Sequence, residues 1–400
     1  MAYDVARVRG LIPALGDGWV HLDPASGMQP SEQVVSAFSC AFRLPRAVPG
    51  APFAASRHAA LVEDGAREAI ADLVGADPRG VVLGPGSAVL LRRLADALGE
   101  TWMLGDEIVV SRLDDDANVT PWVRNAHRHG VGLRWAEIDI ESCEMPLWQF
   151  DRLLTRTTRV VALTAASAQV GTCPEIPAIA DRTQANGTLL VVDLTAAAAF
   201  EPIDLDELGA DVVALDAAAW GGPEVGALVF RTPALLDRLP SCSLDPLARG
   251  PLRLELGPQS APQLAALVAS IEHLSDLVEP DPGQAPSRRE RLRTSLAECQ
   301  SYQSDLLHDL LVGLGGTEVT VLGSPEQRIP LLSLTHPVKA HDVVEHLAHR
   351  GICAIADPGD QGVLAHLGTA EVGGAVRIGL APYTTRAETR ALVAALAELG

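Results

Sequence analysis

Lysine is almost absent from this chain of 400 residues. Only Lys339 among its 31 basic residues is a lysine, and the other basic residues are arginines. A general bias toward arginine explains most of this deficit. Lysine is nevertheless the ordinary side chain that forms a Schiff base, and arginine cannot lose a proton to do so. Schiff-base chemistry on a side chain of this protein therefore depends on one residue.

Long apolar runs are also missing. The longest ones, such as 188–192 and 211–215, have the length of strands and fall far short of the roughly 20 residues that a membrane span requires. The N-terminal sequence MAYDVARVRG lacks the apolar stretch of a secretory signal. We therefore expect a soluble, cytoplasmic protein that makes no use of a membrane.

Neither an excess of positive charge nor paired cysteines are present. The net charge is −20 and no long basic run interrupts it, so we expect no nucleic-acid partner, because phosphate backbones are bound by basic patches. The cysteines are scattered and form no CxxC pair, which predicts ordinary reduced thiols. They stand at positions 40, 143, 173, 242, 299 and 353.

Strand-sized apolar runs alternate with helical patterns through the first 230 residues. Because these runs do not alternate between apolar and polar residues and are separated by helices, they predict a mainly parallel sheet covered on both faces. The last two runs are joined too closely for a helical crossover, so one antiparallel pair is expected. The predicted strands are 80–83, 107–111, 132–135, 159–164, 188–193, 211–216 and 225–230.

The pattern changes after residue 231, and 400 residues exceed what one hydrophobic core usually serves. Helices are predicted at 261–277 and from 288 to about 313, on either side of the proline-containing loop 279–287. Shorter strands and helices follow to the C-terminus. We predict a large α/β domain over 51–255 and a small α+β domain over 256–400, with the N-terminal segment 1–50 packing against the small domain.

Six segments resemble, in one order, the class V aminotransferase family in its cysteine desulfurase-like branch. Each match alone is weak, but together they extend through nearly the whole chain. The resemblance implies the type I fold of enzymes that depend on pyridoxal phosphate (PLP), with a seven-stranded sheet, and a homodimer with sites between two subunits. The segments are 3–30, 113–122, 166–172, 211–230, 254–259 and 377–388.

The segment DVVALDAAAWGGPEVGALVF, residues 211–230, resembles the lysine segment of the family. Its Gly-Pro and Val-Gly pairs place Ala219 at the position of the lysine that binds the cofactor. The resemblance also implies that Asp193, at the end of LLVVD, pairs with the pyridine nitrogen of PLP, although an aspartate there is equally an ordinary helix cap. Lys339 lies in the other predicted domain, and a solvated helix-start lysine is its simpler interpretation.

The resemblance places the cofactor phosphate at Gly86 and Ser87, before a helix predicted over 88–98, since helix N-termini favour anions. Asp216 stands where the family has a serine, and a carboxylate there repels a phosphate dianion. Pro258 stands where a threonine reaches across the dimer interface, and proline offers neither hydroxyl nor N–H. The phosphate contacts of the family are therefore expected to be weakened.

The contacts to the cofactor ring are altered in the same comparison. Ala168 stands at the position of an asparagine, while Asp115 and Asp116 stand where desulfurases stack a histidine. Asn118, in the sequence Asp-Ala-Asn, is a further residue of the implied cofactor site. Trp220 supplies packing at the glycine-rich bend, and we conjecture that it fills space that a cofactor ring otherwise takes.

Arg377 is the retained residue with the clearest use. It matches the arginine that clamps the substrate carboxylate in the family, a task that suits a guanidinium group, and a structural ion pair is the alternative. Cys353, in the apolar run GICAIAD, is expected to be an inert buried thiol instead of the loop cysteine of desulfurases. The histidines 341, 346 and 349 lack metal-site spacing, so no metal is expected.

Three hypotheses follow. The first is a degenerate class V homodimer without covalent PLP chemistry, whose remodelled pocket binds a small carboxylate or a partner protein. The second is an active PLP-dependent aminotransferase, desulfurase or lyase that acts on an amino acid and uses an unanticipated lysine or a noncovalently held cofactor. The third is unrelated chemistry at Asp114–Asp116, Asp193 and Asp216, with or without a metal. Fold alone does not decide among them.

Overall fold

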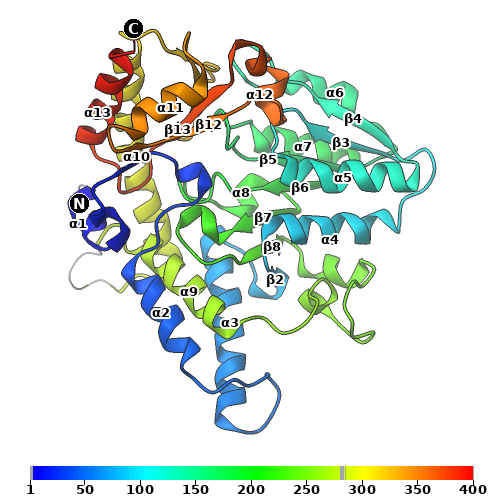
Figure 1. Ribbon diagram of the computed structural model, residues 1–400. Helices are drawn as coiled ribbons and strands as arrows, with labels where there is room; N and C mark the ends of the chain where they lie inside the picture. Colours follow the sequence, from blue (N-terminus) through cyan, green and yellow to red (C-terminus); the bar gives the residue numbers. More distant parts are fainter. Residues whose placement is uncertain (1–2, 280–282, 284, 400) are drawn as a thin grey trace.

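The computed structural model of the protein describes residues 3–279, 283 and 285–399, and its largest element is a seven-stranded sheet (Figure 1). Every strand lies within one residue of a predicted run, which confirms the α/β fold class. The strands are β2 (Val81–Gly84), β3 (Glu107–Ser111), β4 (Gly132–Ala136), β5 (Thr158–Thr164), β6 (Leu189–Asp193), β7 (Val212–Asp216) and β8 (Gly226–Phe230).

The order of the strands across this sheet is β2-β8-β7-β6-β5-β3-β4. From β7 to β4, each strand is parallel to the next one in this order. The predicted antiparallel pair is confirmed, because β8 returns along β7 with Asp216 opposite Gly226. Strand β8 is also antiparallel to β2, so it lies between two segments that are far apart in the sequence.

Helices cover both faces of the sheet. On one face Leu90 and Leu94 of α4 (Ser87–Gly99) and Trp122 of α5 (Asp116–His129) are buried against it. The other face is covered by α3 (Ala54–Val74), α7 (Ile176–Asn186) and α9 (Ala261–Ser275). Full burial of one leucine side chain contributes about 1.5–3 kcal/mol. The short helix α6 (Phe150–Leu153) contacts the edge strand β4, and the short helix α8 (Leu205–Leu208) contacts α7.

A second, antiparallel sheet follows in the C-terminal part, in the order β12-β13-β10-β9. It packs with the C-terminal helices around a core of leucine, isoleucine and valine side chains. Its strands are β9 (Thr320–Val321), β10 (Leu331–Thr335), β12 (Ile355–Asp357) and β13 (Ala375–Gly379). The helices of this part are α10 (Arg288–Leu314), α11 (Ala340–Ala348), α12 (Gly362–His366) and α13 (Arg386–Ala397).

The N-terminal segment contains α1 (Val5–Gly10), β1 (Val20–His21) and α2 (Glu32–Phe42). Strand β1 pairs with β11 (Ile352–Cys353), so this segment lies against the C-terminal part. The proposed domain limits at residues 50 and 255 remain predictions. Of the predicted boundary loop 279–287, residues 280–282 and 284 lie outside the described residues.

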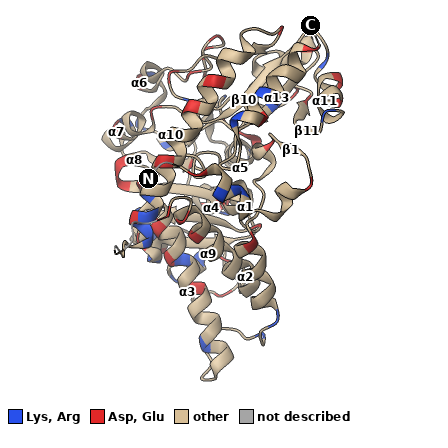
Figure 2. Ribbon diagram, turned by 90° about the vertical axis from the view of Figure 1, so that its left-hand side faces the viewer, with Lys and Arg blue, Asp and Glu red and all other residues tan. Residues whose placement is uncertain are grey.

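Ion pairs connect the first turn of α10 to segments that pack against the large sheet. Arg288 contacts Asp72 of α3 and Glu272 of α9, and Arg289 contacts Asp204. Figure 2 shows residues of both signs close together beside α3 and α9. Within the described part of the chain, no helix is both long and apolar enough to cross a membrane.

Candidate functional site

A cavity of about 110 Å³ lies beyond the carboxyl ends of the central strands, where open α/β sheets bind ligands. Thr164 at the end of β5 and Asp193 at the end of β6 line its floor, and Ser87 at the start of α4 lines its side. Further wall residues are Ala168 and Ala219. Residues from the N-terminal segment and from β10, namely Pro24, Ala25 and Leu331, complete the enclosure.

Asp193 is the most deeply buried ionisable group of this cavity, with 6% of its surface exposed. Its Oδ1 accepts a hydrogen bond of 2.9 Å from the backbone N–H of Thr195. Burial raises the pKa of Asp193 to about 6, and the neighbouring charges of Asp115 and Asp216 act in the same direction. The predicted cofactor-type position is therefore on the cavity, and the same carboxylate also fixes the turn that follows β6.

Asp216 is not among the residues that line the cavity, but it contacts Ser87, which does, at the start of α4. Its Oδ2 accepts a hydrogen bond of 3.0 Å from the backbone N–H of Ser87 and lies 3.5 Å from the Ser87 hydroxyl. Its Oδ1 accepts a bond of 3.2 Å from the N–H of Ala218. Burial raises the pKa of Asp216, and the hydrogen bonds from Ser87 and Ala218 oppose that rise. The N-terminus of α4 thus already holds an anion supplied by the chain.

Ala219 lies on the cavity wall within a single turn of 3-10 helix, η5 (Ala217–Trp220), that follows β7. The N-terminal segment lies across this turn, because the N–H of Met28 donates to the carbonyl of Ala218 at 3.3 Å. Gly221, the residue that follows η5, has φ of 80°, a conformation that favours glycine. The sequence segment around position 219 is therefore held closely against the cavity.

Arg377 on β13 lies just behind the cavity wall. One terminal nitrogen is 3.4 Å from Oδ2 of Asp357, and the other is 3.3 Å from the carbonyl oxygen of Ala168. Its Nε is buried and has no acceptor among the described residues. The structural ion pair considered for Arg377 is thus present, and Ala168 connects the guanidinium to the cavity.

The comparisons with known proteins agree with this geometry. The family profile described as Aminotransferase class-V matches residues 20–278. The chain belongs to the aminotransferase class-V family. This class V chain is 48% identical, over 402 residues that cover 100% of both sequences, to uncharacterized protein MT3887 of Mycobacterium tuberculosis (strain CDC 1551 / Oshkosh).

Two cysteine desulfurases are also similar to this class V chain. The enzyme of Yersinia pseudotuberculosis serotype O:1b (strain IP 31758) is 25% identical over 418 residues, with 99% of this chain and 98% of the enzyme covered. The solved apo structure from Thermococcus onnurineus NA1 superimposes with a TM-score of 0.87 at 21% identity, covering 98% of this chain and 97% of that one. These neighbours confirm the cysteine desulfurase-like, PLP-type fold predicted from the sequence.

Two residues implied for the cofactor site do not line the cavity of this class V chain. Asp116 is exposed in the first turn of α5, and its neighbour Asp115 lines the cavity instead. Asn118 is buried in a separate network, in which its amide donates to Asp114 at 2.6 Å. Asp116 and Asn118 therefore do not line this cavity, because successive residues of a helix point in different directions, and their role toward a cofactor stays a prediction.

Trp220 does not line the cavity either. Its indole N–H donates to the hydroxyl of Ser270 on α9 at 3.1 Å, and its side chain is buried away from the cavity. The tryptophan therefore packs η5 against α9, and the conjecture that it fills space otherwise taken by a cofactor ring stays a prediction. By contrast, Ser87, Ala168, Asp193 and Ala219 do meet at one cavity. Gly86 lies beside them. A Cβ atom added to this glycine would lie 3.3 Å from Oδ2 of Asp216.

Sequence reasoning missed several residues of this site. Thr195 follows Asp193 by two positions, and its hydroxyl lies 3.5 Å from that of Ser87. A threonine just after a strand end was a usable signal for this position. Leu331 and Asp357 come from the small sheet, and no local pattern indicates that they reach the cavity or Arg377.

The residues of this class V chain do not fit PLP as the family resemblance would place it. Drug-sized ligands occupy pockets of about 300–1,000 Å³, whereas this cavity has about 110 Å³. The carboxylate of Asp216 stands at the helix start where the phosphate would bind, and Ala219 offers no amine. The only lysine, Lys339, is exposed at the start of α11 and packs against Gly373.

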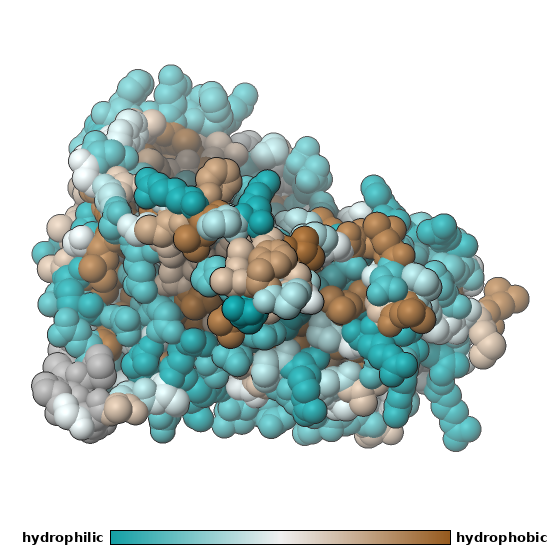
Figure 3. All heavy atoms as spheres, turned by 90° about the horizontal axis from the view of Figure 1, so that it is seen from below, coloured by the Kyte–Doolittle hydropathy of each residue, from teal (hydrophilic) through white to brown (hydrophobic). Residues whose placement is uncertain are grey.

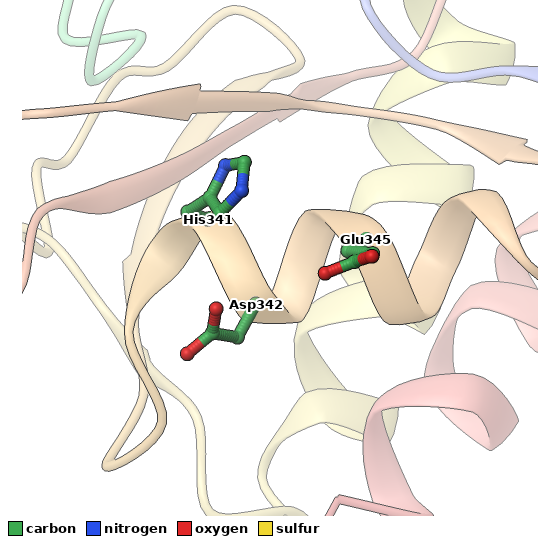
Figure 4. Close-up of side chains that lie close together, drawn as sticks. All are labelled: His341, Asp342 and Glu345. Atoms are coloured by element: carbon green, nitrogen blue, oxygen red, sulfur yellow. The ribbon is translucent and has the colours of Figure 1, made fainter.

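Cys353 and the cluster of His341, Asp342 and Glu345 do not line the cavity. Cys353 is partly buried in β11, and burial raises the pKa of its thiol. On α11, possible ligand atoms of His341, Asp342 and Glu345 lie within 4.8 Å of one another (Figure 4). All three side chains are exposed, and such exposed groups commonly lie close together without a metal ion.

Proposed function

We propose that this class V chain is a degenerate member of the family that does not form a Schiff base with PLP. The observation that carries the proposal is the placement of Ala219 on the cavity wall, combined with the exposed position of Lys339 on α11. Lysine is the side chain that this chemistry requires. The catalytic step characteristic of PLP enzymes therefore has no residue to perform it.

We further propose that the remodelled cavity binds a small carboxylate. Arg377 supports this choice, because its two contacts are long, at 3.3 and 3.4 Å, and its Nε has no acceptor within the described chain. A carboxylate that enters past Ala168 can accept from this guanidinium in competition with Asp357. A volume of about 110 Å³ corresponds to about four water molecules at about 30 Å³ each, so the ligand is small.

The alternative is an active PLP-dependent enzyme that acts on an amino acid. Membership of the class V family supports it, as does Asp193, which lines the cavity where such enzymes hold the pyridine nitrogen. A noncovalently held cofactor requires neither Ala219 nor Lys339 to react. It does require space and an anion site, and the contacts of Asp216 argue against both.

One experiment separates the proposed function from covalent PLP chemistry. The purified protein is incubated with PLP, reduced with borohydride and examined for absorbance and for covalently bound pyridoxyl groups. We expect no internal-aldimine band and no pyridoxyl group in the site. A stoichiometric band that borohydride fixes onto the chain contradicts the proposal.

The chain offers a matched control for this experiment. Lys339→Arg produces a protein without any lysine side chain. Labelling that this variant abolishes comes from Lys339. If loss of that label also abolished turnover of an amino acid, the active-enzyme alternative would stand.

We also propose a homodimer. The turn that connects α2 to α3 projects from the body of the molecule and exposes apolar side chains (Figures 1 and 3). Phe42, Val48 and Leu61 are exposed by 64%, 63% and 70%, and Phe42 and Val48 line a groove with Pro258. Large exposed apolar patches mark interaction surfaces. In the family resemblance, residue 258 lies at the subunit interface, which favours a second copy of this chain as the occupant.

A further inference from the structure

A side chain from the end of strand β7, Asp216, lies at the start of helix α4. Helix α4 extends over 13 residues from Ser87, and its N-cap is Gly86, which has no side chain to accept a hydrogen bond. The carboxylate of Asp216, at the end of β7, accepts the N–H of Ser87 instead. The first N–H groups of a helix lack partners within the helix, and the helix dipole favours an anion there. Asp216 satisfies both requirements.

The surrounding backbone leaves little room for a second anion. A Cβ atom built on Gly86 would lie 3.3 Å from Oδ2 of Asp216. Gly226 of β8 lies opposite Asp216, and a Cβ built on it would lie 2.2 Å from the carbonyl carbon of Gly86. Three chain segments, the loop before α4, the end of β7 and the start of β8, thus meet around one carboxylate.

The second oxygen of the same carboxylate fixes the turn that carries Ala219. Oδ1 accepts the N–H of Ala218 and caps η5. One side chain therefore connects the start of α4 to the turn that carries Ala219. A bound phosphate would meet a negative charge at about 3 Å from the N–H that it needs, and like charges at such distances repel strongly.

We propose that the carboxylate of Asp216 is a built-in substitute for the phosphate group of a ligand. The wild-type site consequently rejects inorganic phosphate and phosphate monoesters, PLP included, and accepts only ligands that carry no phosphate at this end. Removal of the carboxylate exposes the N-terminus of α4 together with the hydroxyls of Ser87 and Thr195, whose oxygens lie 3.5 Å apart. Such an arrangement of helix N–H groups and hydroxyls is a phosphate site.

The test compares the wild type with Asp216→Ser, which removes the charge and opens the space, and with Asp216→Asn, which removes the charge and keeps the bulk. Inorganic phosphate is the first probe and PLP is the second, with sulfate-free chloride buffer of equal ionic strength as the control. Binding is measured by isothermal titration calorimetry and by the shift of the unfolding temperature. Wild type is expected to show no saturable binding of either probe.

Asp216→Ser is expected to bind phosphate with an affinity at least tenfold above that of the wild type, and Asp216→Asn to bind phosphate more weakly than Asp216→Ser because its amide still fills the space. Saturable binding of phosphate to the wild-type protein overturns the proposal, and this arm does not depend on the folding of any variant. Equal affinities of folded Asp216→Ser and wild type overturn it as well. These outcomes are distinct from a borohydride-fixed adduct, which would contradict the proposed function and leave the phosphate result unchanged.

Discussion

Replacement of Asp114 by asparagine is expected to remove a pH-dependent loss of stability. Asp114 is buried below the cavity, where it accepts hydrogen bonds from the hydroxyl of Ser111 and from the amide of Asn118. Burial raises the pKa of Asp114 from 3.8 to about 7, and the nearby charge of Asp193 adds to the rise. An asparagine keeps the shape and retains partners for both neighbours, but it cannot ionise.

The direction and size of the effect follow from proton linkage. A carboxyl group with a higher pKa in the folded chain contributes stability that is complete below its unfolded pKa and is lost as the pH rises through its folded pKa. For Asp114 this window extends from about pH 4 to about pH 7. One pKa unit corresponds to about 1.4 kcal/mol, so the span from 3.8 to about 7 sets an upper limit of about 4 kcal/mol.

Urea unfolding at a series of pH values from 4 to 8 measures this difference. The free energies of unfolding of wild type and Asp114→Asn are expected to be similar at pH 4, and the variant should be more stable by about 2–4 kcal/mol at pH 8. Asp181→Asn, at an exposed position of α7, controls for the removal of one charge from a chain of net charge −20. A difference between wild type and Asp114→Asn that stays constant with pH would refute the reasoning.

Two other predictions concern stability and assembly. Glu255 is 3% exposed, and it accepts two hydrogen bonds from Arg67 at 2.7 and 3.1 Å and one from the N–H of Leu83 at 2.9 Å. Glu255→Ala should therefore lower the free energy of unfolding, measured with urea, by about 3–5 kcal/mol, because it leaves a buried charge without its partner. A loss below about 1 kcal/mol would contradict this prediction. Light scattering should give the wild type twice the 42.1 kDa mass of the chain. Phe42→Arg should halve that mass whereas the equally exposed Val312→Arg should not, and a monomeric wild type would rule out the dimer.

The large sheet could be predicted from the sequence because its strands are buried on both faces. Runs such as LLVVD in β6 and VVALD in β7 contain few polar residues, and their ends are marked by charged residues or glycine. The contact between β8 and β2 could not be predicted, because it joins residues 226–230 to residues 81–84 and no local pattern specifies such a pairing. Pairing between distant segments depends on the assembled core.

The site residues that could be predicted from the sequence lie at the ends of strands or loops. The sequence does not show which side chains of a turn face the cavity. Asp193 and Ser87 follow from their places at the ends of β6 and of the loop before α4. Trp220 and Ala219 are adjacent in sequence, yet one packs against α9 and the other faces the cavity. One turn of 3-10 helix sets that difference, and the sequence spacing contains no record of it.

The contacts of Asp216 bear on what a lysine at position 219 could do. Restoration of a lysine by Ala219→Lys would supply an amine to the cavity, but the start of α4 would still be filled by the Asp216 carboxylate. A helix N-terminus binds one anion at a time, since the same N–H groups and the same dipole are used. Under the proposed function, lysine chemistry and phosphate binding would therefore be lost through separate residues that share one hydrogen-bonded turn. Because the carboxylate also caps that turn through Ala218, its replacement alters the shape of the cavity wall as well as its charge.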